Sequence, residues 1–296
     1  MVVAGALLTG CGTATAVKKT DTAVTSAFPV TVTDDAGRSV TIDSRPEHIV
    51  SLAPANTEIV YSLDEMDRLV GVTTYDDYPA SVKDIAKVGD FTTPNLEAIA
   101  ALDPDVVLVT TGVQADVIDK LEKLGATVVA IDPQTLDGVY TSIGTVGAVL
   151  GEKQKAADVV SGMKSDLAKI QDAVGTETVP CFVEIAQNPL YTAGTGTLLD
   201  DLIKQAGGRN VVTQAGYVGY SLEQLLTDDP EVYLATKGSM SAPGELAKRS
   251  GYSALSAVKN DRVAVLDDNL VSRPGPRVIQ GVREIAEALH PEAFGK

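Results

Sequence analysis

Residues 151–175 read GEKQKAADVVSGMKSDLAKIQDAVG, a run without proline. Its apolar residues follow one another at alternating steps of four and three: Ala156, Val160, Met163, Leu167, Ile170 and Val174. This spacing is typical of one face of an α-helix, which at its usual rise would be roughly 35 Å long. Because strands and helices alternate on both sides of it, we predict that this helix joins two lobes. The alternative is a long surface helix within one domain.

An internal repeat favours the two lobes. Residues 95–109 read NLEAIAALDPDVVLV and residues 221–235 read SLEQLLTDDPEVYLA. Each copy has a polar helix cap, a short helix, an Asp-Pro turn and an apolar strand, and the period is too long for a solenoid. The sequence therefore predicts an α/β protein with two doubly wound α/β lobes, residues 28–150 and 176–296, and the bridging helix 151–175 between them.

Charge and the first residues limit the possible locations. The net charge of −16 opposes binding to nucleic acid. Residues 1–11, MVVAGALLTGC, are apolar but too short to span a bilayer, and they fit the end of a signal peptide. Residues 12–27 are rich in Thr, Ala and Lys and are typical of a flexible tether. The only other cysteine besides Cys11 is Cys181, which we expect to be a small core residue of a predicted strand; the alternative is a reactive thiol.

The scarce aromatic residues gather in predicted loops that follow strands. Aromatic residues make up 4% of the chain and Trp is absent. Parallel strands are predicted near residues 48–52, 70–74, 106–110 and 127–131 in the first lobe, and near 181–185, 232–236 and 262–266 in the second. Ligands of such sheets bind beyond the carboxyl ends of the strands. Residues expected there are Tyr75, Phe91, Tyr191, Tyr217, Asn269 and Arg273. Alternatively, each ring covers a local core and Arg273 is an ordinary surface residue.

Motifs for catalysis are missing from the sequence. It contains no nucleophile elbow, phosphate-binding loop, dinucleotide fingerprint or paired-cysteine motif. Its two histidines, His48 and His290, lie outside the predicted cleft loops. We therefore expect no catalytic residue, no metal site, no catalytic cofactor and no enzymatic activity. An extracytoplasmic enzyme that uses cleft carboxylates remains a remote alternative.

These motifs together resemble the helical-backbone class of solute-binding lipoproteins of ABC importers, whose members bind cobalamin, haem or ferric siderophores. The resemblance covers residues 28–294 and is carried by LTGC, RPEHIVSLAPANTEIVYSL, TTYDDYP, the two repeat copies, the bridging helix and RPGPR. It implies a ligand in the cleft between the lobes and little lobe movement. LTGC resembles a lipobox, which implies lipidation of Cys11 and an extracytoplasmic protein anchored to the cell membrane, or a periplasmic one if the cell has two membranes. The resemblance to the class also implies a monomer.

The resemblance also gives roles to a pair of acids and to the cleft residues. Glu97 and Glu223 match positions, one per lobe, that dock onto arginines of an ABC permease dimer with its ATPase subunits. The alternative is plain stabilisation of two helix starts. The ring pattern is most similar to the cobalamin binders, which implies that Tyr75, Phe91, Tyr191 and Tyr217 enclose a corrinoid. A ferric siderophore and haem are the alternatives, although Phe91 cannot ligate haem iron.

Overall fold

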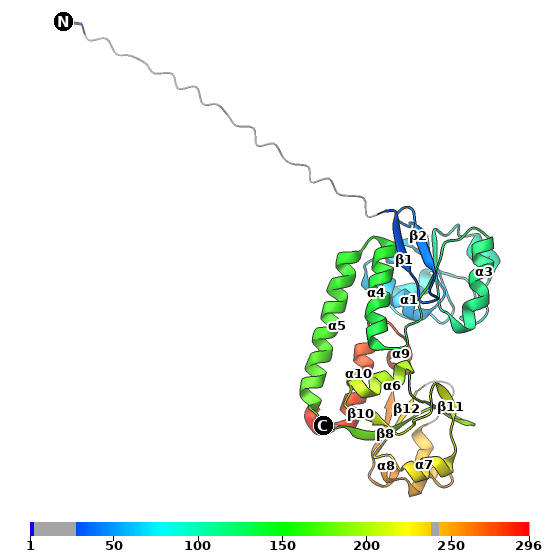
Figure 1. The fold of residues 1–296 in the computed structure, drawn as a ribbon, viewed down its shortest axis with the longest axis vertical. Coiled ribbons are helices and arrows are strands. Elements are labelled where there is room, and N and C mark those ends of the chain that lie inside the picture. Colours follow the sequence, from blue (N-terminus) through cyan, green and yellow to red (C-terminus); the bar gives the residue numbers. More distant parts are fainter. Residues whose placement is uncertain (3–27, 238–242, 296) are drawn as a thin grey trace.

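Two α/β lobes and a long helix beside them make up the computed structural model, which describes residues 1–2, 28–237 and 243–295. Figure 1 shows the first lobe above the second, with α5 (Lys153–Val174) extending along both. The fold class is as predicted. The predicted lipidation site Cys11 lies outside the described residues. The boundaries 28–150, 151–175 and 176–296 stay a proposal.

The first lobe is built on a parallel sheet with the order β5-β4-β3-β6-β7. Its central strand pair is completely buried, as expected for a sheet covered on both faces. A hairpin precedes it. The elements are β1 (Val30–Thr33), β2 (Ser39–Ile42), β3 (Ile49–Ser51), α1 (Pro54–Ser62), β4 (Leu69–Val72), β5 (Ala86–Lys87), α2 (Leu96–Ala100), β6 (Val106–Val109), α3 (Ala115–Lys123), β7 (Val128–Ala130) and α4 (Leu136–Leu150).

The second lobe has a mixed sheet with the order β11-β9-β8-β12-β13, and β10 also pairs with β8. Strands β8, β12 and β13 are parallel, whereas β9 is antiparallel to β8 and to β11. The elements are β8 (Val179–Gln187), β9 (Leu190–Ala193), α6 (Leu198–Gln205), β10 (Gly208–Asn210), β11 (Tyr217–Gly219), α7 (Leu222–Asp228), β12 (Val232–Thr236), α8 (Ser256–Lys259), β13 (Val263–Leu266), α9 (Asp268–Val271) and α10 (Val278–Leu289).

The repeat seen in the sequence is also present in the structure. Asn95 caps α2 and Ser221 caps α7, each by accepting hydrogen bonds from backbone N–H groups of the first turn. The equivalent residues Asp103 and Asp229 both have positive φ, 46° and 37°. Each copy then runs into the strand β6 or β12, which lies between two parallel neighbours. The two copies therefore place their helices and strands in corresponding positions of the two lobes.

Helices α4 and α5 run side by side along the lobes (Figure 1). Gly151 ends α4 with φ 82°, a left-handed cap that suits glycine, and α5 starts two residues later. The apolar face predicted for 151–175 is the packed one, because Ala156, Met163 and Ile170 are buried. Helix α10 packs against the other end of α5. Cys181 is buried in β8, as predicted, and burial raises the pKa of its thiol to about 12.

Candidate functional site

A cleft lies between the lobes, and residues from both line it. Its main hollow has a volume of about 630 Å³, in the range of small-molecule sites. A second hollow of about 380 Å³ shares Pro54, Phe91, Ser272 and Arg273 with it. The main hollow is lined by Pro54, Tyr75, Phe91, Thr92, Ile185, Leu199, Tyr217, Thr236, Asp268, Asn269, Val271, Ser272 and Arg273. The structure thus brings together five of the six predicted ligand residues, Tyr75, Phe91, Tyr217, Asn269 and Arg273, and leaves out Tyr191.

Tyr75 is presented by a tight turn after β4. The carboxylate of Asp76 accepts hydrogen bonds from the backbone N–H of Thr73, at 2.9 Å, and from its hydroxyl, at 2.5 Å. The backbone N–H of Tyr75 in turn donates to the Thr73 hydroxyl. Asp76 is 5% exposed, and burial raises the pKa of its carboxyl. These bonds fold the turn onto the end of the strand, and Tyr75 is 60% exposed at the cleft.

Phe91 is held by a polar turn ahead of α2. The Asp90 carboxylate accepts hydrogen bonds from the backbone N–H groups and hydroxyls of Thr92 and Thr93, and these lower the pKa of Asp90 to about 2. The buried amide of Gln114 donates to the carbonyl oxygens of Phe91, at 2.8 Å, and Leu52, at 2.7 Å. The turn therefore fixes the backbone of Phe91 against the first lobe.

Tyr217 and Tyr191 come from the antiparallel edge of the second sheet, in β11 and β9, and not from loops as predicted. Short segments that contain glycine look like loops in sequence, and only their pairing makes them strands. The hydroxyl of Tyr191 donates to the carbonyl oxygen of Tyr217 at 3.0 Å. Tyr191 is 39% exposed but lines neither hollow. Tyr191 therefore contacts β11 beside Tyr217 without lining the cleft.

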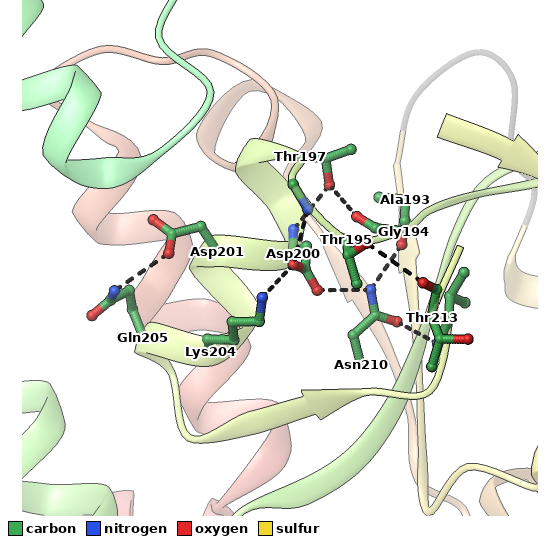
Figure 2. A network of polar contacts seen from close by, with 12 residues as sticks. Ala193, Gly194, Thr195, Thr197, Asp200, Asp201, Lys204, Gln205, Asn210 and Thr213 are labelled. Carbon is green, nitrogen blue, oxygen red and sulfur yellow. Dashed lines mark hydrogen bonds and ion pairs between the residues drawn. The ribbon is translucent and has the colours of Figure 1, made fainter. Parts of the chain in front are cut away.

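A polar network holds the end of β9 against the start of α6 (Figure 2). Asp200, 1% exposed, accepts hydrogen bonds from Asn210 and Lys204. Asn210 also donates to the carbonyl oxygen of Ala193, at the end of β9. The hydroxyl of Thr197, the helix cap, donates to the carbonyl oxygen of Gly194 and accepts from the backbone N–H of Asp200. These bonds hold Leu199 of α6 and the strands of the edge in fixed relative positions at the cleft.

Arg273 follows α9 and reaches across to the first lobe. Its Nη1 atom is 2.6 Å from Asp77 Oδ1 and 3.2 Å from Glu58 Oε1. Arg277 makes two hydrogen bonds to the same Glu58, at 2.9 and 2.6 Å, and lies over the ring of Tyr78, 4.0 Å from its centroid. We call these two carboxylates and two guanidinium groups the interlobe ion cluster. It joins the two lobes at the cleft.

Glu58 and Asp77 were not predicted from the sequence, nor were the lining residues Asp132 and Asp268. Glu58 is only 2% exposed and is the one charged residue of α1. A charge at such a position needs a partner, and this is the signal that could have identified it. The two arginines of RPGPR are four residues apart, which allows both to reach one carboxylate.

Glu97 and Glu223 lie in the first turns of α2 and α7, and both are exposed. Glu223 also lines a polar hollow with Gln214, Gln224 and Asp228. Neither Glu lines the cleft, so the structure separates these acids from the ring residues. Their docking role stays a prediction.

The described residues hold no cluster of three His, Cys, Asp or Glu side chains that could bind a metal ion. His290 lies beside the carbonyl oxygen of Gly207 and His48 beside that of Asp103, and neither lines the cleft. None of the helices in the described ranges is long and apolar enough to cross a membrane. The groups at the cleft are suited to stacking, hydrogen bonding and charge recognition.

Residues 49–270 match the model of the periplasmic binding protein family, which covers most of the chain. The chain belongs to the periplasmic binding protein family. This periplasmic binding protein is 38% identical to an uncharacterized ABC transporter substrate-binding lipoprotein, YvrC of Bacillus subtilis, over 99% of this chain and 96% of that protein. It is a substrate-binding protein of the ABC-transporter type.

Solved structures with named ligands share the fold of this periplasmic binding protein. The periplasmic vitamin B12 binding protein BtuF of Vibrio cholerae is 28% identical, with a TM-score of 0.73, and the match covers 85% of this chain and 99% of that one. A periplasmic heme binding protein from Pseudomonas aeruginosa is 26% identical, with a TM-score of 0.75, over 83% and 93% of the two chains. The class thus includes proteins for different macrocycles.

Proposed function

We propose that this protein captures cobalamin or a related corrinoid between its lobes and delivers it to an ABC permease. The observation that carries the proposal is the ring-lined cleft. Tyr75 and Phe91 from the first lobe and Tyr217 from the second line one hollow. Flat rings on both sides suit a macrocycle, because stacking buries apolar area without requiring a charge. The similarity to a vitamin B12 binding protein supports the same ligand.

Haem and ferric siderophores are the other candidates, and the similarity to a heme binding protein keeps haem among them. Haem needs an axial ligand on its iron. Among the described residues that line the two hollows, Tyr75 and Tyr217 have hydroxyls that could ligate iron, whereas Phe91 cannot. A ferric siderophore complex is often anionic and would need cleft cations. The corrinoid therefore fits the lining best.

The remaining roles belong to the same proposal. Glu97 and Glu223, one on each lobe, would contact arginines of a permease dimer that works with its ATPase subunits. Cys11 would carry the lipid anchor of an extracytoplasmic monomer, in keeping with the lipoprotein relative. None of these roles depends on which ligand the cleft binds.

Calorimetric titration of the protein with cyanocobalamin, hemin and a ferric siderophore tests the ligand. We expect cyanocobalamin to bind, and Phe91→Ala and Tyr217→Ala each to weaken its affinity by about fivefold or more, because a lost stacking partner costs about 1–3 kcal/mol. Leu124→Ala is the control: Leu124 is 58% exposed and lines neither cleft hollow. No binding of cyanocobalamin at tens of micromolar would reject the corrinoid.

Transport into proteoliposomes with the permease and ATPase subunits tests docking. We expect Glu97→Arg and Glu223→Arg to reduce ligand delivery while binding of the ligand in solution is unchanged. Glu177→Arg, an exposed charge reversal outside both helices, is the matched control. Normal delivery by the double variant Glu97→Arg, Glu223→Arg would show that these acids do not dock.

A further inference from the structure

We infer that the cleft selects its ligand by charge, accepting neutral or cationic corrinoids and rejecting anionic ones, because its lining cation is already neutralised and the unpaired charges that face the hollows are carboxylates. This inference rests on the proposed function and adds to it a class of corrinoid. It concerns the side groups of the macrocycle, which the aromatic lining alone does not distinguish.

Arg273 is already paired with carboxylates of the protein. Among the described residues that line either hollow, Arg273 is the only basic one. Its side chain is 14% exposed and forms ion pairs with Asp77 and with Glu58, which is itself 2% exposed. Arg277 supplies the second positive charge, so the interlobe ion cluster balances two carboxylates with two guanidinium groups. Arg273 can still donate hydrogen bonds to neutral amide oxygens, but it offers a ligand little net positive charge.

Asp132 carries a negative charge on the first-lobe side of the cleft. It lines the second hollow and accepts a hydrogen bond from the hydroxyl of Thr111. Its charge acts across the cleft: the pKa of Tyr217 is raised first by burial of the ring and second by the negative charge of Asp132. Within the described ranges, Asp132 forms no ion pair.

Asp268 is the corresponding carboxylate on the second-lobe side of the cleft. It lines the main hollow at the start of α9 and is half-buried. Burial raises the pKa of Asp268, whereas a hydrogen bond with Thr236 and the positive charge of Arg273 oppose that rise and favour the carboxylate. Like Asp132, it forms no ion pair with another described residue. The two carboxylates thus add negative charge from opposite lobes to a cleft whose arginine is already paired.

Loss of water disfavours an anionic ligand in this cleft. An anionic ligand would lose water on entering the aromatic cleft, would meet two carboxylates and would find no free cation to compensate. The net charge of −16 also repels anions as they approach. A cationic macrocycle meets the opposite conditions, because carboxylates and ring faces both attract positive charge.

Four corrinoids with the same ring system test this on the intact protein by calorimetry: aquocyanocobinamide, which is cationic, dicyanocobinamide and cyanocobalamin, which are neutral, and dicyanocobyrinic acid, which is anionic at neutral pH. We expect the cation to bind at least as tightly as the neutral forms and the acid to bind weaker by about tenfold or more. Added salt should narrow the difference, because the Debye length is about 10 Å at 0.1 M.

Asp77→Asn provides the sharpest variant, because it removes one partner of Arg273 while Asp77 itself lies outside the lining. The affinity of dicyanocobyrinic acid relative to dicyanocobinamide should rise by about fivefold. Asp132→Asn should shift the same ratio in the same direction. Asp119→Asn changes the net charge equally on the exposed face of α3 and should leave the ratio unchanged.

Charge selection and corrinoid capture fail in different experimental outcomes. If all four corrinoids bind with equal affinity, or if the acid binds tightest, charge selection is wrong and corrinoid capture stands. If no corrinoid binds, both are overturned. Lys237 follows the lining residue Thr236 but lines neither hollow. A loss of acid binding in Lys237→Gln that Asp119→Asn does not show would identify a free cation and overturn the inference.

Discussion

Arg273 and Glu58 are 215 residues apart in the sequence, and their side chains are 3.2 Å apart in the structure. The sequence predicts Arg273 at the cleft, and the structure places it there. The structure pairs its guanidinium group with two acids of the first lobe. Residue type and position after a strand were sufficient to locate Arg273. The charges around it could not be read from the sequence, because they come from the other lobe.

Another carboxylate, Asp34, couples the stability of the first lobe to pH. It accepts hydrogen bonds from the side chain and backbone of Arg38 and from the backbone N–H of Ala130. Burial alone would raise its pKa, but these bonds outweigh burial and hold the pKa of Asp34 below its usual value of 3.8. A carboxyl whose pKa is lower in the folded state stabilises the fold above its unfolded pKa and loses that contribution as the pH falls through the folded value.

We therefore expect Asp34→Asn to lower the free energy of unfolding at pH 7 by about 1–3 kcal/mol. The difference from wild type should shrink as the pH falls from about 5 toward 3 and below. Urea denaturation at a series of pH values measures it, and Asp119→Asn should keep the wild-type pH dependence. A difference between Asp34→Asn and wild type that stays constant over this range would contradict the coupling.

At the scale of elements, periodic helices, capped repeats and the apolar parallel strands were predictable, whereas one apolar helix and the antiparallel strands were not. The predicted helix 151–175 appears as α5, and the caps Asn95 and Ser221 start α2 and α7. Helix α4 and the antiparallel strands β9 and β11 were missed. Helix α4 is so apolar and glycine-rich that a helical pattern does not stand out in it, and the strands are short and depend on their neighbours.

Gly147 lies where α4 packs closely against α5. A Cβ atom on Gly147 would lie 2.4 Å from the Cβ of Ala156, whereas one on Gly144 of the same helix would meet nothing within 4 Å. We expect Gly147→Ala to reduce the free energy of unfolding by about 1–3 kcal/mol through overpacking. Gly144→Ala should raise it by about 0.5–1 kcal/mol through helix propensity. Urea denaturation of both variants measures this, and equal effects would contradict the close approach.

At the scale of the whole molecule, the lobes are connected by more than one helix. Helix α5 lies along both lobes (Figure 1) and packs against α10, and Asp201 of α6 accepts a hydrogen bond from the backbone N–H of Leu136 at the start of α4. The interlobe ion cluster adds a third connection, next to the cleft. These connections make small lobe movements the expectation for this protein.

Arg277→Ala should weaken the connection at the cleft. The substitution removes two hydrogen bonds to the buried Glu58 and the contact with the ring of Tyr78. We therefore expect it to lower the free energy of unfolding by about 2–4 kcal/mol. Faster hydrogen exchange in α1 and α10 should accompany it. Lys169→Ala, which removes an exposed ion pair with Asp166 on α5, should cost at most about 1 kcal/mol. Equal losses in the two variants would show that the cluster does not hold the lobes together.

The sequence by itself determined the two-lobe α/β architecture, the long helix and five of the residues that line the cleft, Tyr75, Phe91, Tyr217, Asn269 and Arg273. These follow from local rules: helical spacing, capping residues and rings placed after strands. Only the tertiary structure decided that Tyr191 stays outside the hollow, that the second sheet is mixed and that Arg273 is paired with Glu58 and Asp77. Strand pairing and charge balance depend on residues that are distant in the chain, and folding alone brings them together.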